Sequence, residues 1–240
     1  MELFDSHAHY DDEKFNEDRD YIIEQIFKSG VTKFVSAGYS LKSSKMGIEL
    51  ANKYEYIYTT CGVSPNDIPQ NKEDIDFQLS QIESLAKENK DIQKYVFLKQ
   101  IDIANKLNLP IMIHTRDAIM DTIDIIKSTN FVKPGIFHCC PFNKDLVQEG
   151  LKKGFYISFA GPVTFKNSKN AAEIVNLVPL DKILIETDSP YLAPEPNRGK
   201  RNDSRNVEFI AKKIAELKNM NIEEIAKITY KNAEKVFNIK

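Results

Sequence analysis

A short segment near the start of the chain, LFDSHAH at residues 3–9, contains the side chains best suited to chemistry. Successive side chains of an extended strand alternate between its two faces, so Asp5, His7 and His9 should point the same way. Two imidazoles beside a carboxylate can chelate a divalent cation. The alternatives are a surface pattern or two core histidines that find hydrogen-bond partners within the protein.

The other two histidines occupy comparable places. The chain has four histidines in all, and His114 and His138 each end an apolar run, as Asp188 ends the run 182–188. Because every histidine follows a predicted buried strand, we predict that these side chains converge on one site. The predicted metal ligands are His7, His9, His114, His138 and Asp188. Taken alone, Asp188 would be a turn or helix-cap carboxylate.

Imidazole and carboxylate ligands suit Zn²⁺, Mn²⁺ or, with more oxygen donors, Mg²⁺. Such ions can activate water for attack on a phosphoryl group, and Asp188 could take the proton of that water as a general base. Arg116 could hold a phosphate through two hydrogen bonds. The alternative for Arg116 is an ion pair with Asp117 or another carboxylate.

Length and composition set limits on the class of protein. A chain of 240 residues with 42% hydrophobic residues can form two small domains or one α/β barrel. Its apolar runs are too short to span a membrane, and its start lacks the pattern of a signal peptide. We therefore expect a cytoplasmic protein without a membrane partner. The three cysteines, Cys61, Cys139 and Cys140, are expected to be reduced core thiols, because their number is odd.

The formal net charge is −2, so the molecule as a whole does not attract nucleic acid. Any attraction for phosphate must be local. The candidate is the basic segment 198–201, in which Lys200 and Arg201 could guide a polyanionic backbone toward the site. The alternative is a solvated basic turn.

Apolar runs alternate with amphipathic stretches along the chain. The predicted strands are 3–9, 33–38, 56–62, 110–114, 135–138, 155–160 and 182–188. The predicted helices are 15–29, 43–53, 73–89, 91–107, 117–127, 143–153, 170–177, 203–217 and 221–237. Ser43 or Ser44 is the expected cap of the second helix.

Seven strands in β-then-α order indicate a parallel sheet, either a (β/α)8 barrel or a doubly wound open sheet. The predicted ligands end the first, fourth, fifth and seventh strands. Residues from strands so dispersed meet most easily above the C-terminal rim of a closed barrel. We therefore predict a single barrel domain over residues 1–240 that lacks or distorts its fourth strand, because two predicted helices adjoin at residues 89–90 with no strand between them.

Several segments together resemble the TatD family of metal-dependent DNases, which are (β/α)8 barrels of the amidohydrolase-like superfamily. The resemblance runs from the first strand to about Phe237. It is carried by FDSHAH at 4–9, PIMIHTRDA at 110–118, FYISFAGP at 155–162, IETDSPYLAP at 185–194 and RGKRN at 198–202.

The resemblance implies two divalent ions, one held by His7, His9 and Asp188 and one held by His114 and His138. In the family a glutamate of the fourth strand, in a Gly-Glu-x-Gly-Leu-Asp-Tyr motif, bridges them. This chain lacks that motif, whose place is the junction at 89–90. Without a shared anion two dications repel each other, so we expect weaker occupancy or a single ion.

The missing segment also affects the barrel, because two strand edges lose their partner. The chain could leave a gap, borrow a strand from a neighbouring molecule or cover the edges with the helices predicted over 73–107. The natural protein could also carry a segment that this sequence has lost.

The predicted function is a divalent-metal-dependent deoxyribonuclease that hydrolyses phosphodiester bonds, with activity impaired by the missing glutamate. One alternative is an ester or amide hydrolase that acts on another substrate. The other is an inactive relic that keeps the fold.

Overall fold

A computed structural model of the chain describes residues 1–64 and 90–239. The helix predicted over 73–89 lies outside the described residues. The strands are β1 Leu3–Ala8, β2 Val31–Ala37, β3 Ile57–Thr60, β4 Met112–Ile113, β5 Ile136–Phe137, β6 Tyr156–Phe159 and β7 Ile183–Ile185. Each lies within a predicted strand or shifts from it by no more than two residues, so the predicted strand order is confirmed for the described part of the chain.

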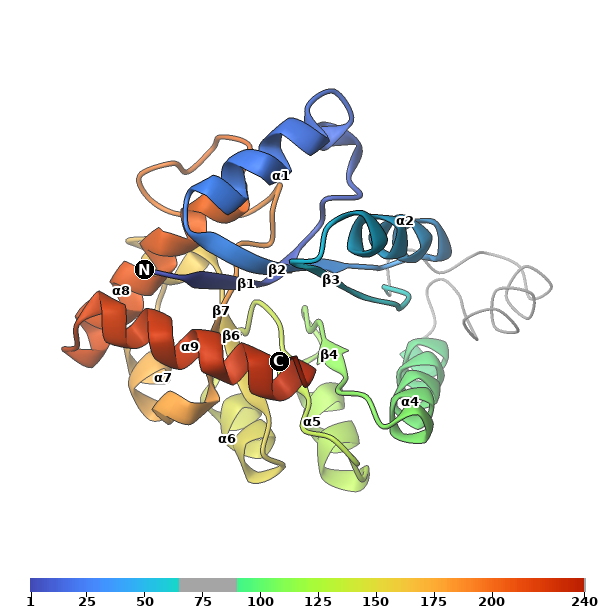
Figure 1. Ribbon diagram of the computed structural model, residues 1–240. Helices are drawn as coiled ribbons and strands as arrows, with labels where there is room; N and C mark the ends of the chain where they lie inside the picture. The colour runs from blue at the N-terminus through green and yellow to red at the C-terminus, as the bar shows by residue number, and fades with distance from the viewer. Residues whose placement is uncertain (65–89, 240) are drawn as a thin grey trace.

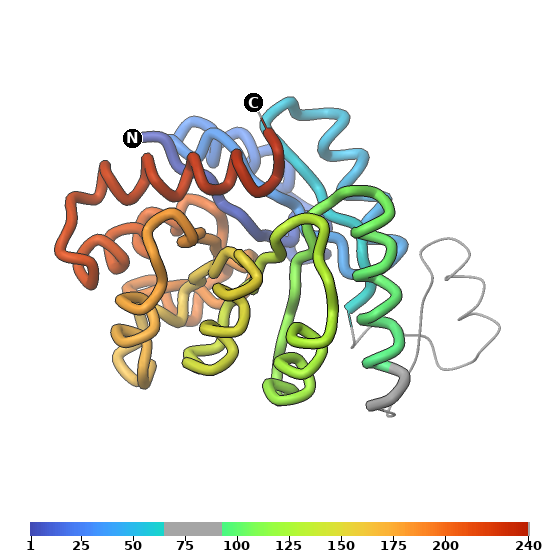
Figure 2. The backbone as a smooth tube through the Cα atoms, turned by 90° about the horizontal axis from the view of Figure 1, so that it is seen from below, coloured from blue at the N-terminus to red at the C-terminus, as the bar shows by residue number. Residues whose placement is uncertain are grey.

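The helices alternate with these strands. They are α1 Arg19–Lys28, α2 Leu41–Lys53, α4 Lys90–Leu107, α5 Ile119–Ser128, α6 Lys144–Lys152, α7 Ala171–Leu177, α8 Val207–Lys218 and α9 Ile222–Phe237. Short 3-10 helices span Glu13–Phe15, Gly161–Thr164, Leu180–Lys182 and Ser204–Asn206. Figure 2 shows α4, α5, α6 and α7 following one another in chain order along one side of the molecule.

The strands form two parallel sheets, one in the order β1-β2-β3 and one in the order β4-β5-β6-β7. The sheets adjoin where a parallel bridge joins Ala8, the last residue of β1, to Ser189 beyond β7. The strands therefore follow one another from β3 through β1 and β7 to β4, as in a barrel with one open side (Figure 1).

Side chains from both sheets fill one interior. Tyr58 of β3 and Met112 of β4 pack against an inner cluster of buried residues. Five strands contribute one buried residue each to this cluster: Phe4, Val35, Ile136, Tyr156 and Leu184. Ala233 and Val236 of α9 belong to the same cluster. Because several of these residues are the first or second of their strands, α9 covers the N-terminal end of the barrel and leaves the C-terminal end for a site.

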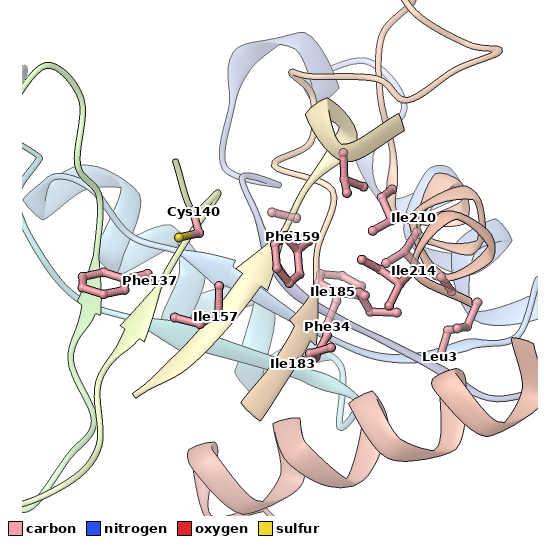
Figure 3. Packing of buried hydrophobic residues seen from close by; sticks show 14 of the residues in the cluster. Leu3, Phe34, Phe137, Cys140, Ile157, Phe159, Ile183, Ile185, Ile210 and Ile214 are labelled. Carbon is pink, nitrogen blue, oxygen red and sulfur yellow. The ribbon is translucent and has the colours of Figure 1, made fainter. Parts of the chain in front are cut away.

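A second and larger cluster lies between the strands and the surrounding helices. Figure 3 shows Ile210 and Ile214 of α8 beside Ile183 and Ile185 of β7. Along β7, Ile183 and Ile185 alternate with Leu184, which faces the interior, so β7 is buried on both sides. Burial on two sides explains why the strands read as continuous apolar runs.

In the described part of the chain, no strand lies between β3 and β4, the outer strands of the two sheets. There the side chain of Gln100 in α4 accepts a hydrogen bond from the Val63 N–H at 3.1 Å and donates one to the Val63 carbonyl at 3.4 Å. These two bonds resemble the pairing that a neighbouring strand would make. Within the described residues, α4 therefore satisfies part of the backbone just after β3, which agrees with one of the three alternatives, that the helices predicted over 73–107 cover the edges.

Two local predictions are wrong. The cap of α2 is Ser40, whose hydroxyl accepts the Ser43 N–H, while the Ser43 hydroxyl accepts the Ser40 N–H in return. This reciprocal capping box starts the helix two residues earlier than periodicity alone predicted. Cys61 is exposed and Cys139 is partly buried, so of the three predicted core thiols only Cys140 is fully in the core. All three cysteines are free, as expected.

Candidate metal centre

Four ligand atoms meet at the C-terminal ends of the strands. The Nε2 atoms of His7 and His9 lie 3.1 Å apart. Oδ1 of Asp188 lies 3.3 Å from Nε2 of His9, 3.6 Å from Nε2 of His7 and 3.9 Å from Nε2 of His138. The predicted convergence of these side chains is therefore present in the structure, although they come from β1, β5 and the segment after β7.

The contact between β1 and the segment after β7 places Asp188. Its backbone N–H donates to the carbonyl of His7 at 2.9 Å, and its φ of 58° lies in the left-handed region. The preceding residue, Thr187, is held by Asp5, which accepts its N–H at 2.9 Å and its hydroxyl at 2.6 Å. These bonds fix the backbone just before Asp188, and the turn there directs the Asp188 carboxylate toward the histidines.

Asp5 is thus a positioning residue and not part of the predicted chelate. Its side chain is completely buried, and its oxygens accept hydrogen bonds from Thr187 and from the His7 N–H. The pairing of β1 with β2 is irregular between Asp5 and Ala8. The simple alternation that put Asp5, His7 and His9 on one face therefore does not hold there.

The second nitrogen of each β1 histidine identifies the free lone pairs. Nδ1 of His9 lies 3.0 Å from the Ala37 carbonyl, which can only accept, so Nδ1 carries the proton. Nδ1 of His7 lies 2.7 Å from the Met112 sulfur, a weak acceptor, so the same assignment holds for His7. Two Nε2 lone pairs then face each other at 3.1 Å. They repel unless a cation lies near both, so the residues fit a divalent metal ion.

His138 stacks on His7, with ring centroids 3.5 Å apart and an interplanar angle of 18°. Its Nδ1 lies 2.7 Å from Oε1 of Glu186, although the direction of its N–H departs from that of a regular hydrogen bond. Both side chains are buried. Sequence analysis missed Glu186. The available signal was its spacing of two residues from Asp188, which suits side chains on one face of an extended segment.

The close packing of these histidines and carboxylates shifts their pKa values. Burial alone would lower the pKa of His138, but the carboxylates of Glu186 and Asp188 raise it to about 9. Burial alone would raise the pKa of Asp188, but His138 and His9 hold it below its usual range. Burial, followed by the positive charges of the other histidines, lowers the pKa of His7 well below its usual value. A neutral imidazole and an anionic carboxylate are the forms that ligate metals.

His114 lies at the rim. Its ring centroid is 5.4 Å from that of His138, and the side chain is exposed. In the described chain, two sets of three residues have ligand atoms within 4.8 Å of one another: His7, His9 and Asp188, and His7, His138 and Glu186. His114 belongs to neither set, so its role as a ligand stays a prediction.

The predicted substrate-binding residues lie in different surroundings. Arg116 is exposed, with Nε 3.9 Å from an oxygen of Asp117. Lys200 is exposed and its Nζ lies 3.3 Å from the side-chain oxygen of Asn197. Arg201 donates two hydrogen bonds to Asp18, at 2.6 and 2.8 Å, so much of its charge is already compensated. Their contact with substrate stays a prediction.

A cleft of about 660 Å³ adjoins the turn that carries Asp188. Its lining contains four basic residues and two aromatic ones: Lys14, Arg198, Lys200, Arg201, Phe165 and Tyr191. Nζ of Lys14 lies 4.1 Å from the ring centroid of Tyr191, and Cζ of Arg198 lies 4.1 Å from that of Phe165. The aromatic rings thus hold two cations in place at the surface of the cleft.

A barrel of parallel strands with imidazole and carboxylate ligands at its C-terminal rim defines a metal-dependent hydrolase. The chain belongs to the family described as TatD related DNase, whose family model matches residues 4–90 and 84–238.

Two relatives are also described as metal-dependent hydrolases. The chain is 41% identical to the uncharacterized metal-dependent hydrolase YabD of Bacillus subtilis strain 168, over 99% of both chains. It is 34% identical to the uncharacterized metal-dependent hydrolase YcfH of Escherichia coli K12, over 100% of this chain and 97% of that protein. Among solved structures, the TatD homologue YjjV of Escherichia coli K12 has a TM-score of 0.84 at 19% identity and covers 99% of this chain and 98% of its own.

The comparisons also bear on the missing segment. The alignments with YabD and YcfH extend over 253 and 258 residues, more than the 240 of this chain, so both relatives carry residues that it lacks. The family match divides into two parts that meet at residues 84–90. This is the place at which the sequence predicts that the fourth strand is missing.

Proposed function

We propose that this metal-dependent hydrolase cleaves phosphodiester bonds of DNA. The observation that carries the proposal is the convergence of three imidazole Nε2 atoms on Oδ1 of Asp188, next to a cleft lined by basic side chains. A divalent cation at these atoms would supply Lewis-acid polarisation of a phosphoryl oxygen and favour ionisation of a nearby water. His7, His9 and Asp188 would hold it, and Nε2 of His138, 3.9 Å from Oδ1 of Asp188, faces the same site.

The remaining roles fall to side chains around the centre. Asp188, whose pKa is held low despite its burial, stays anionic at neutral pH and is the group able to accept a proton from the attacking water. The net charge of −2 gives no general attraction for DNA. The cleft with Lys14, Arg198 and Lys200 is therefore the proposed path for the phosphate backbone. Arg116, which follows β4, is a further proposed phosphate contact.

We further propose that the chain binds one ion and not two. The two compact sets of the described residues share His7, so they do not form two separate sites, and His114 lies outside both. The chain also lacks the Gly-Glu-x-Gly-Leu-Asp-Tyr motif that the family resemblance implies for a bridging glutamate. Free thiols at all three cysteines favour the cytoplasm as the site of action.

The test is a cleavage assay with purified protein, stripped of metal and supplied with Mn²⁺, Mg²⁺ or Zn²⁺. Single-stranded and duplex oligonucleotides are compared with bis(p-nitrophenyl) phosphate and p-nitrophenyl acetate. We expect metal-dependent cleavage of the oligonucleotides that falls at least 100-fold in His7→Ala and stays unchanged in Glu173→Gln, a surface control. Hydrolysis of the carboxyl ester alone, or binding of metal without hydrolysis of any substrate, would contradict the proposal.

A further inference from the structure

We propose that Glu186 is a positioning residue that holds His138 so that Nε2 of this imidazole faces the cation site. The proposal rests on the metal-dependent class of the protein and does not depend on DNA as the substrate.

The carboxylate of Glu186 joins the ends of two strands. One oxygen, Oε1, accepts the backbone N–H of Cys139 at 2.7 Å and lies 2.7 Å from Nδ1 of His138. Glu186 follows β7 directly, whereas His138 and Cys139 follow β5. A single oxygen therefore links the imidazole to the backbone beside it and fixes both relative to the turn that carries Asp188.

Burial of the Glu186 carboxylate beside His138 costs free energy, because the carboxylate loses its contact with water. The side chain has no exposed surface, and its Oε2 has no hydrogen-bond partner in the described part of the chain. An ionised carboxylate is rarely buried unless it is paired. Its ion-pair partner within the described residues is His138. Glutamine or a hydrophobic residue would fill the same space at less cost, so packing alone does not explain a carboxylate here.

The imidazole has two nitrogens, and the partner of one decides what the other can do. With Nδ1 facing Glu186, Nε2 of His138 is left to face Asp188, at 3.9 Å from Oδ1. Rotation of the ring would exchange the two nitrogens and turn Nε2 away from the centre. A carboxylate on the far nitrogen of a metal-ligating histidine is a common way to fix both its orientation and its tautomer.

The backbone after His138 also needs support. Cys139 has a φ of 40°, in the left-handed region that residues with a side chain seldom adopt. Its N–H is the one that Glu186 accepts. Loss of the carboxylate would therefore release both the strained turn and the imidazole that precedes it.

The experiment compares Co²⁺ binding by the wild type, Glu186→Gln and the surface control Glu173→Gln. Absorption spectra of the bound ion report affinity and coordination, and circular dichroism of the metal-free proteins confirms that each is folded. We expect Co²⁺ to bind roughly 10–100-fold more weakly to Glu186→Gln, with the same absorption bands at saturation. If Glu186→Gln does not fold, Glu186→Asp, which keeps the charge but withdraws the oxygen, undergoes the same measurements with the same expectation.

A double-mutant cycle separates positioning from general structural support. If Glu186 acts through His138, then Glu186→Gln should change Co²⁺ affinity less than about twofold in a His138→Ala background. Three results would overturn the proposal: equal affinities of Glu186→Gln and the wild type, new absorption bands that identify Glu186 as a direct ligand, or a full effect of Glu186→Gln in the absence of His138.

Discussion

Two lone pairs that face each other are the most informative feature at the scale of single residues. The Ala37 carbonyl and the Met112 sulfur occupy the outer nitrogens of His9 and His7, so the inner nitrogens have no proton to share. Asp188 then contributes the negative charge that a cation requires. The types of these residues could be predicted from the sequence, but their protonation follows only from their neighbours in the fold.

The pH dependence of metal binding is a prediction at this scale. Because Glu186 and Asp188 outweigh burial and raise the pKa of His138 to about 9, the metal-free protein carries a proton on this imidazole at pH 7. A cation can bind Nε2 of His138 only after that proton leaves. We expect Co²⁺ affinity to rise about tenfold per pH unit from pH 7 to pH 8 and to level off near pH 9. Calorimetry in buffers of different ionisation enthalpy should detect release of about one proton, and none would contradict the assignment.

At the scale of elements, the decisive contact is the one between β1 and the segment after β7. Asp5 binds Thr187, the carbonyl of His7 binds the Asp188 N–H, and Ala8 pairs with Ser189. These contacts span about 180 residues of sequence. The pattern predicted both strands, but it could not show that Asp5 serves the other strand, because that role depends on which strands become neighbours.

Asp5 gives a prediction about stability. Its burial outweighs its hydrogen bonds and raises its pKa from 3.8 to about 7. The folded state therefore binds more protons than the unfolded state between about pH 4 and pH 7, so the free energy of unfolding falls as pH rises through this window. The full contribution is roughly 4 kcal/mol, from a shift of about three pKa units at about 1.4 kcal/mol per unit.

Asp5→Asn should remove that pH dependence, since an amide does not titrate. Urea unfolding of the metal-free protein at pH 5 and pH 8 measures the effect, with Asp124→Asn on the surface of α5 as the matched control. An Asp5→Asn protein that loses as much stability between the two pH values as the wild type would show that Asp5 is not the source.

The 3-10 helix at Gly161–Thr164 supports the cleft. A Cβ atom at Gly161 would collide with the carbonyl oxygen of Leu192, on the segment that lines the cleft. We expect Gly161→Ala to lower stability by about 1–3 kcal/mol, as overpacking does, and to weaken oligonucleotide binding. Thermal melting and fluorescence anisotropy measure the two effects. Gly62→Ala is the control, because its nearest neighbour is the flexible end of Gln100 at 3.2 Å. Equal effects of the two substitutions would contradict the account.

At the scale of the whole molecule, the strand order and the C-terminal location of the site could be predicted from the alternation of apolar runs. Apolar runs that end in histidine or aspartate are a local signal, so the convergence of His7, His9, His138 and Asp188 was predictable, and their role as metal ligands stays a prediction. The pairing of Glu186 with His138 and the pairing of Arg201 with Asp18 were not, because each depends on a partner chosen by tertiary packing. The sequence also predicted the missing strand, and in the described residues no strand lies between β3 and β4.

The most direct test of the central claim is anomalous diffraction from crystals of the protein grown or soaked with Mn²⁺. The account predicts one anomalous peak within coordination distance of Nε2 of His7, Nε2 of His9 and Oδ1 of Asp188. A Mn²⁺-treated crystal with no peak among these three atoms, or with the ion bound only elsewhere, would contradict it.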